Sequence, residues 1–155
     1  MNMTVSSLPQ RVFDLMYARD GFSRWLGIEL IAVGEGTATL RMAVRPEMLN
    51  GFAVAHGGIT YSLADSAFAF ACNSFGRLSV SIETSITHTQ AVRAGDVLIA
   101  EARLITHSNK IGTYQATVTN QSGDIVAVFK GICYKTDKQL DTDAQESSFE
   151  TRTAQ

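Results

Sequence analysis

The feature that most constrains the fold of this chain is the run from His56 to Ser74, HGGITYSLADSAFAFACNS, which contains one charged residue, Asp65. An apolar helix of this length is buried on most of its sides, so other elements must cover it. Gly57 and Gly58 open the run, and their missing side chains allow a ligand to approach the backbone closely. The fold is therefore expected to form around one central helix whose amino-terminal end stays accessible.

The amino-terminal end of this helix and Asp65 together indicate a site where negative charge develops. The first N–H groups of a helix have no intrahelical acceptor, and the helix dipole is positive there. A buried carboxylate is costly unless it is paired or used in chemistry. In a structural interpretation, the charge of the Asp65 carboxylate is stabilised by Ser62, by backbone groups or by water. The glycine pair at the helix entry favours the functional interpretation, in which the carboxylate takes part in acyl chemistry.

The spacing between the two features predicts a dimer. Asp65 follows Gly57 by eight residues, which is roughly 12 Å along a helix that rises about 1.5 Å per residue. One carbonyl group cannot contact both groups across that distance. A second copy whose helix runs antiparallel beside the first would bring Asp65 of one chain to Gly57 of the other. The chemistry hypothesis therefore requires a two-fold dimer with two equivalent sites.

The rest of the chain predicts an antiparallel sheet that wraps the central helix. Turn signals separate the β-like runs, and short connections between strands favour antiparallel pairing. One long helix with such a sheet is an α+β arrangement. A first helix is expected at about 7–20, a short apolar link at 22–26, strands at 26–33 and 37–44 before the central helix, and strands at 78–92, 96–107, 110–120 and 124–135 after it.

The length of 155 residues is most simply one domain, expected at 1–136. Residues 137–155 are polar with almost no large apolar side chains, and this composition is typical of a disordered tail. The domain boundary is therefore placed at the end of the last β-like run.

The composition limits the classes of function. The chain is 45% apolar and 18% charged, which favours burial of apolar surface against another subunit. A formal net charge of −2 argues against a general nucleic-acid binder. Two cysteines without metal-ligand spacing predict neither a disulfide scaffold nor a metal site. Neither a signal peptide nor a membrane span is evident, so we expect a soluble cytoplasmic protein without a membrane partner.

Two polar residues flank the entry of the central helix. Asn50 can hold a water molecule or a substrate group, although Asn50-Gly51 is also a simple turn signal. His56 can act as an acid or base, or it can hold the loop through a hydrogen bond. His88 and His107 lie in or at the end of predicted strands without a carboxylate partner in sequence, and they are interpreted as structural. Cys72 is interpreted as a small buried apolar residue rather than a nucleophile.

Three parts of the sequence carry a resemblance to a known family: the His56-Gly57-Gly58 entry, SLAD at 62–65 and AFAFACNS at 67–74. With Asn50 six residues before His56, this pattern resembles hotdog-fold acyl-CoA thioesterases, specifically the PaaI (phenylacetyl-CoA thioesterase) group. The resemblance covers about residues 26–135. It implies a hotdog fold, hydrolysis of aryl-acyl (phenylacetyl-type) CoA thioesters in phenylacetate degradation, no metal or cofactor, and a homodimer that pairs into a homotetramer.

The resemblance also implies roles for individual residues. The Gly57 N–H would polarise the thioester carbonyl, and Asp65 from the facing subunit would be the nucleophile or the base that activates water. Asn50 would help to position the water, and His56 would orient the thioester region. Ser81 is the nearest candidate for an assisting serine after the helix.

The residues that contact the substrate are assigned more broadly. Gly58 lies at the helix entry, and aromatic residues near the site are candidates for the acyl pocket. Basic residues are candidates for the phosphates of coenzyme A, or are ordinary solvated charges. The alternatives for the serine are Ser79 and Ser85, the aromatic candidates are Tyr61, Phe68 and Phe52, and the basic candidates are Arg93, Lys110 and Lys130.

Three other functions stay open. A medium-chain fatty acyl-CoA thioesterase would use the same site with another acyl pocket. A hydratase or dehydratase of the same fold would use a carboxylate–histidine pair in a differently placed motif, whereas here His56 precedes the glycines and Asp65 lies in mid-helix. A non-catalytic acyl-CoA-binding protein would gain nothing from a buried carboxylate. Hydrolysis is therefore the favoured function.

Overall fold

The structure is a computed structural model that describes residues 6–142. It begins with helix α1 (Leu8–Arg19), at whose amino-terminal cap Ser7 accepts a hydrogen bond from the Gln10 N–H. Helix α2 (Gly21–Leu26) follows directly, where the sequence predicts only an apolar link. The Asp20 carboxylate caps α2 by accepting the Ser23 N–H at 2.9 Å. This helix has six residues, too few for an apolar periodicity to show in the sequence.

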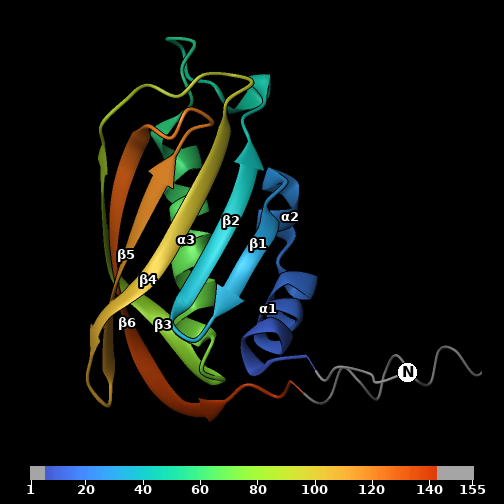
Figure 1. Cartoon of the computed structure of the whole chain (residues 1–155), viewed down its shortest axis with the longest axis vertical. Coiled ribbons are helices and arrows are strands. Elements are labelled where there is room, and N and C mark those ends of the chain that lie inside the picture. Colours follow the sequence, from blue (N-terminus) through green and yellow to red (C-terminus); the bar gives the residue numbers. More distant parts are fainter. Residues whose placement is uncertain (1–5, 143–155) are drawn as a thin grey trace, which may run out of the picture.

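Six antiparallel strands form one sheet in the order β1-β2-β4-β5-β6-β3. All six predicted strands are present, and their ends differ from the prediction by a few residues. The long helix connects β2 to the far edge of the sheet, so that β3 pairs with β6 (Figure 1). The strands are β1 (Glu29–Gly34), β2 (Thr37–Ala43), β3 (Arg77–His88), β4 (Val97–His107), β5 (Ile111–Thr119) and β6 (Ile125–Gln139).

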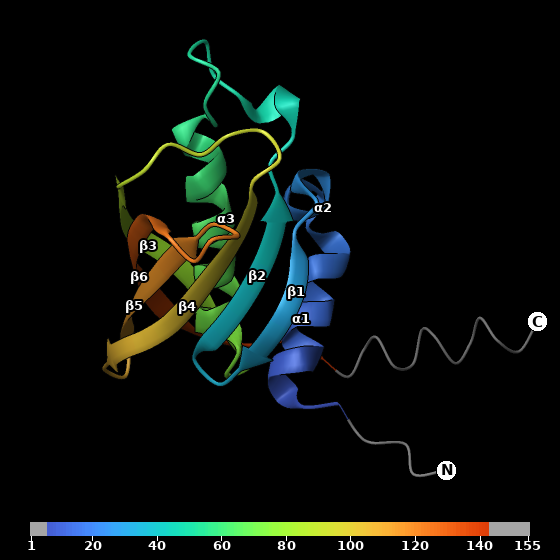
Figure 2. The same ribbon diagram turned by 45° about the horizontal axis from the view of Figure 1, so that its top comes forward.

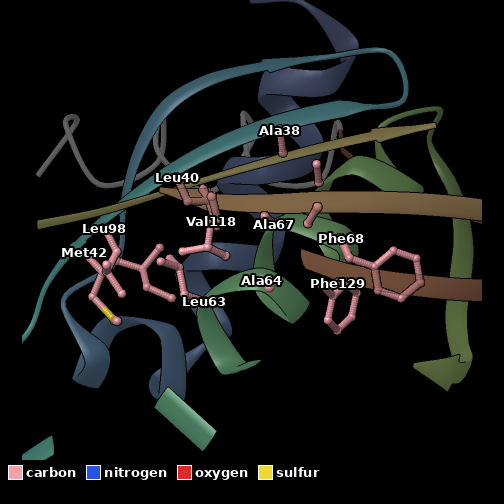
Figure 3. Packing of buried hydrophobic residues seen from close by; sticks show 14 of the residues in the cluster. Ala38, Leu40, Met42, Leu63, Ala64, Ala67, Phe68, Leu98, Val118 and Phe129 are labelled. Atoms are coloured by element: carbon pink, nitrogen blue, oxygen red, sulfur yellow. The ribbon is translucent and has the colours of Figure 1, made fainter. Parts of the chain in front are cut away.

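The central helix α3 (Gly57–Asn73) has 17 residues and contacts every strand of the sheet. The sheet curves around it, with α1 and α2 beside β1 (Figures 1 and 2). Apolar side chains of α3 interlock with the inward-facing residues of the strands (Figure 3). The chain therefore has the α+β hotdog fold that the sequence predicts. Buried residues of this core include Ala38, Leu40, Met42, Leu63, Ala64, Ala67, Leu98 and Val118.

The last strand continues past the predicted domain boundary at residue 136. Strand β6 ends at Gln139, and Asp137 within it lies 2.6 Å from Lys110. The Leu140 N–H then donates a hydrogen bond to the Gly76 carbonyl. Strand pairing uses backbone groups, so these polar residues extend the sheet without apolar side chains. Residues 143–155 of the predicted tail lie outside the described residues.

Candidate active site

The amino-terminal end of α3 presents one unpaired backbone donor. The Gly58 N–H donates to His56 Nδ1 at 2.9 Å, and the Ile59 N–H donates to the His56 carbonyl at 2.9 Å. For the Gly57 N–H, no acceptor exists among residues 6–142. The capping bond also sets the tautomer of His56, because an accepting Nδ1 leaves the proton of the neutral ring on Nε2. Gly57, rather than Gly58, is therefore the donor available to a ligand.

A pocket of about 380 Å³ opens at this end of α3. Gly57 and Thr60 line it from the helix, and the opposite wall is formed by His88 at the end of β3 and by the loop 89–92. The Ala55 N–H donates to the Val92 carbonyl at 2.7 Å, which holds the loop before α3 against the loop after β3. Both loops lie at the same end of the sheet (Figure 2). The pocket therefore depends on segments about thirty residues apart in the chain.

His88 lines the pocket although the sequence marks it only as a structural strand residue. A Cβ atom built on Gly57 would lie 3.1 Å from His88 Nε2 and 3.6 Å from its Cε1. The imidazole therefore stands directly over the Gly57 backbone, in space that a Cβ atom would narrow. A histidine at a strand end carries no local sequence signal for this contact, because α3 and β3 meet only in the folded sheet.

Asp65 lies in the middle of α3 and is half-buried. The structure forms no hydrogen bond or ion pair to its carboxylate from any of the described residues. Burial raises the pKa of this carboxyl above its ordinary value. Ser62, the side chain suggested as its structural partner, instead donates to the Gly58 carbonyl at 2.6 Å. The Ser62 option of the structural interpretation therefore does not apply in this structure, and the carboxylate stays available.

A single chain does not bring Asp65 to Gly57. Both residues belong to the continuous helix α3, eight residues apart, so that roughly 12 Å of helix separates them. This agrees with the spacing expected from the sequence. Any site that uses both groups must take them from two chains.

Asn50 and Ser81 lie outside the pocket at Gly57. The Asn50 Oδ1 accepts the Phe52 N–H at 2.8 Å, which forms a tight turn, and Ala53 in this loop has a φ of 59°. The Asn50 amide nitrogen has no hydrogen-bond acceptor in the described part of the chain. Ser81 is exposed on β3, opposite Cys133 of β6.

The two rival serines differ in their surroundings. Ser79 is buried, and its N–H donates to the Asn73 Oδ1 at 2.8 Å, so this residue joins β3 to the end of α3. Ser85 is exposed on β3, as Ser81 is. Burial therefore removes Ser79 as an assisting serine.

The three aromatic candidates differ in burial: one is half-buried, one lies in the core and one is exposed. Tyr61 is half-buried, and its hydroxyl shares a hydrogen bond of 2.7 Å with Thr84 Oγ1 of β3. Phe68 is 1% exposed and packs against Phe129 and Tyr114, so it offers no surface to a substrate, contrary to the prediction. Phe52 is 89% exposed in the loop before α3.

The basic candidates are also placed differently from one another. Lys110 lies in the β4–β5 turn, at the opposite end of the sheet from the start of α3 (Figure 1), and pairs with Asp137. This ion pair raises the pKa of Lys110. Lys130 pairs with Glu83 at 3.0 Å. Arg93 directly follows the pocket wall at Val92, and its guanidinium forms no ion pair with the described residues. Arg93 alone of the three is adjacent to the pocket.

Metal binding and membrane insertion find no support within residues 6–142. This part of the chain holds no group of three or more His, Cys, Asp or Glu side chains that could bind a metal ion. None of its helices has both the length and the apolar character that a membrane crossing requires.

Comparison with known proteins places the chain in a family. Residues 52–127 match the thioesterase superfamily. A putative esterase of Archaeoglobus fulgidus is 41% identical over 135 residues, which cover 87% of this chain and 88% of that protein. The acyl-coenzyme A thioesterase PaaI of Escherichia coli is 40% identical over 116 residues, which cover 75% of this chain and 83% of that protein.

A solved structure agrees with these sequence matches. The E. coli PaaI protein from the phenylacetic acid degradation operon superimposes with a TM-score of 0.84 and 35% identity, over 86% of this chain and 96% of that chain. The chain therefore belongs to the thioesterase superfamily, in the PaaI group of hotdog-fold acyl-CoA thioesterases. It is an enzyme of the thioester hydrolase class, and the resemblance seen in the α3 sequence is confirmed.

Proposed function

We propose that this enzyme hydrolyses aryl-acyl, phenylacetyl-type CoA thioesters to the free acid and coenzyme A. The observation that carries the proposal is the unpaired N–H of Gly57, a residue that lines the pocket at the start of α3. The aryl-acyl specificity is supported by the relation to the E. coli protein of the phenylacetic acid degradation operon. We assign the enzyme to the same kind of pathway, in the cytoplasm.

The proposed chemistry uses the two separated features of α3. The Gly57 N–H donates to the thioester oxygen and stabilises the negative charge that develops there. The Asp65 carboxylate of a second subunit accepts a proton from a water molecule whose oxygen attacks the carbonyl carbon. Alternatively, the carboxylate attacks first, and water then hydrolyses the mixed anhydride. In both routes the carbon–sulfur bond breaks, the thiolate of coenzyme A takes up a proton, and the acid leaves as a carboxylate.

The remaining polar residues have supporting roles in this proposal. His56, held by its capping bond through Nδ1, orients the thioester region with its Nε2–H. The unused amide nitrogen of Asn50 positions the water, and Ser81 assists from β3. Arg93 is the basic residue proposed to contact coenzyme A, because it is adjacent to the pocket.

The proposed site requires a homodimer, for which β3 is the pairing edge. This 12-residue strand ends the sheet, and its Val80 and Ile82 are 44% and 56% exposed. A long edge strand with exposed apolar side chains is a surface that pairs readily with another chain. Antiparallel pairing of β3 with its copy would place the two α3 helices side by side. We further expect two such dimers to form a homotetramer.

Mixing two inactive variants tests the shared site. Gly57→Pro and Asp65→Asn chains, refolded together, form dimers in which one of two sites is intact in each heterodimer. With random pairing, about a quarter of wild-type activity should return, because half of the dimers are mixed. Thiol release before and after mixing is the measurement. Activity that stays at the level of the separate variants would contradict a site built from two chains.

A panel of acyl-CoA thioesters tests the substrate class. We expect the highest kcat/KM for phenylacetyl-type thioesters in a thiol-release assay, because the relation to PaaI favours an aryl acyl group. Straight-chain octanoyl- and decanoyl-CoA are the matched alkyl substrates. A higher kcat/KM for these would instead assign a medium-chain fatty acyl-CoA thioesterase. Hydration of an enoyl-CoA, or acyl-CoA binding without thiol release, would overturn the hydrolytic proposal.

A further inference from the structure

We propose that His88 is a further catalytic residue of this enzyme, whose Nε2–H donates a second hydrogen bond to the thioester oxygen beside the Gly57 N–H. The inference rests on the proposed function, because it uses the same pocket and the same oxygen. It adds a residue that the sequence motif around α3 does not contain.

The first observation is the position of the ring relative to Gly57. Of the three His88 ring atoms near a Cβ built on Gly57, Nε2 is the closest at 3.1 Å, followed by Cε1 at 3.6 Å and Cδ2 at 3.8 Å. The Nε2 corner of the ring therefore points at the Gly57 backbone. In a helix, both the Cα–Cβ direction and the N–H bond tilt toward the amino-terminal end. His88 Nε2 thus lies at the same end of α3 from which the Gly57 N–H extends.

The second observation is that both donors are available and belong to residues that line the same pocket. The Gly57 N–H has no acceptor, and the His88 ring has no hydrogen-bond or ion-pair partner, within residues 6–142. Both residues line the pocket of about 380 Å³. In contrast, the ring of His56 already accepts the Gly58 N–H through Nδ1. Of the two histidines at this end of α3, His88 is therefore the one whose ring forms no hydrogen bond within the described residues.

The chemistry has a use for a second donor. A carbonyl oxygen has two lone pairs, so it can accept two hydrogen bonds, and each preorganised donor stabilises the oxyanion formed during attack on the thioester. His88 is fixed at the last position of β3, where it pairs with Ala127 of β6. A donor on a paired strand needs little reorganisation as the charge develops. In this role the proton stays on Nε2, and no bond to His88 forms or breaks.

The test compares His88→Phe, His88→Gln and the control His107→Phe. Phenylalanine keeps the ring volume without a donor, and glutamine restores an N–H at a similar reach. His107 is an exposed histidine at the end of β4, at the opposite end of the sheet from the pocket. The substrates are the preferred acyl-CoA of the panel and the 4-nitrothiophenol ester of the same acid, whose leaving thiol has a much lower pKa. Circular dichroism and the Tm monitor folding.

We expect His88→Phe to lower kcat on the order of 100-fold on both thioesters, with little change in KM for the acyl-CoA. His88→Gln should recover at least about tenfold of this loss, and His107→Phe should match the wild type. An unchanged kcat for His88→Phe would overturn the inference. A loss confined to the CoA ester would also overturn it, because His88 would then protonate the leaving sulfur. A rise in KM alone would reduce His88 to a binding residue.

The experiments distinguish a failure of the proposed function from a failure of the inference about His88. A wild-type enzyme that releases no thiol from any acyl-CoA removes the proposed function, and the inference about His88 with it. An active wild type with a fully active and folded His88→Phe variant removes the inference about His88 alone. Loss of activity together with a lowered Tm in His88→Phe is resolved by His88→Gln, since recovery of the Tm without recovery of kcat contradicts a donor role.

Discussion

Replacement of Asp65 by asparagine is expected to lower acyl-CoA hydrolysis by roughly several hundredfold or more and to leave a folded oligomer. The amide has nearly the shape of the carboxylate, but it neither accepts the proton of an attacking water nor acts as a nucleophile. The measurement is kcat for thiol release, with size-exclusion chromatography to follow the oligomer. Ser62→Ala is the matched control on the same helix, and it should retain near wild-type turnover. Near wild-type turnover of Asp65→Asn would rule out the assignment.

The same variant should be more stable than the wild type at neutral pH. Burial raises the pKa of Asp65 in the folded chain above its ordinary value of 3.8. The unfolded chain therefore loses this proton at a lower pH than the folded chain. The free energy of unfolding falls as the pH rises from the unfolded pKa to the folded pKa, and the loss is complete above both. The Asp65→Asn variant avoids this loss because its amide does not ionise, so its Tm at neutral pH should be higher.

Catalytic activity should change with pH in the opposite sense to stability: it should increase as the pH rises. The reaction needs the ionised carboxylate, and kcat/KM should fall as the pH decreases through the raised pKa of Asp65. A pH profile of kcat/KM for the wild-type enzyme measures this acid limb. An acid limb at or below the ordinary aspartate value would contradict the assignment of Asp65 as the ionised group.

Replacement of Gly57 by proline is expected to lower kcat by about 100- to 1,000-fold, which is the usual effect of removing one donor from an oxyanion site. Proline removes the N–H at the first position of α3, where a helix accepts proline without losing an internal hydrogen bond. His56 before it has φ −57° and ψ 135°, a conformation that a residue preceding proline adopts readily. The helix should therefore form while the donor is absent.

Gly57→Ala is the control for the added bulk of the proline ring. Alanine keeps the N–H but places a Cβ 3.1 Å from His88 Nε2, so the imidazole must move by a few tenths of an ångström. We expect a clearly smaller loss of kcat in Gly57→Ala than in Gly57→Pro, at equal Tm. Equal losses in the two variants would mean that space over Gly57, and not its N–H, is what the reaction requires.

Features that depend on neighbouring residues were predictable from the sequence. The glycine entry, the apolar run and the lone carboxylate define α3, because capping and helical periodicity are local properties. The alternation at Ala38, Leu40 and Met42 identifies the buried face of β2, since side chains alternate across a strand. The separation of Gly57 and Asp65 also follows from helix geometry alone. Helix α2 was not predicted, because its six residues are too few to show a helical period of apolar side chains.

Features that depend on contacts between distant segments became visible only in the folded chain. Phe68 and Tyr61 occupy the same helix and look alike in sequence, yet the sheet buries Phe68 completely and leaves Tyr61 beside β3. Lys110 and Arg93 both carry a positive charge next to a predicted strand. In the folded chain, however, Lys110 pairs with Asp137 of β6, far from the pocket.

The candidate site also combines features that follow from local sequence with features that depend on the folded sheet. The sequence alone predicts that α3 offers a backbone donor at its start and a carboxylate two turns later, because both follow from 3.6 residues per turn. It does not predict that β3 lies at the far edge of the sheet, where its last residue, His88, stands over Gly57. That contact joins residues about thirty positions apart, and only the pairing order of the whole sheet brings them together.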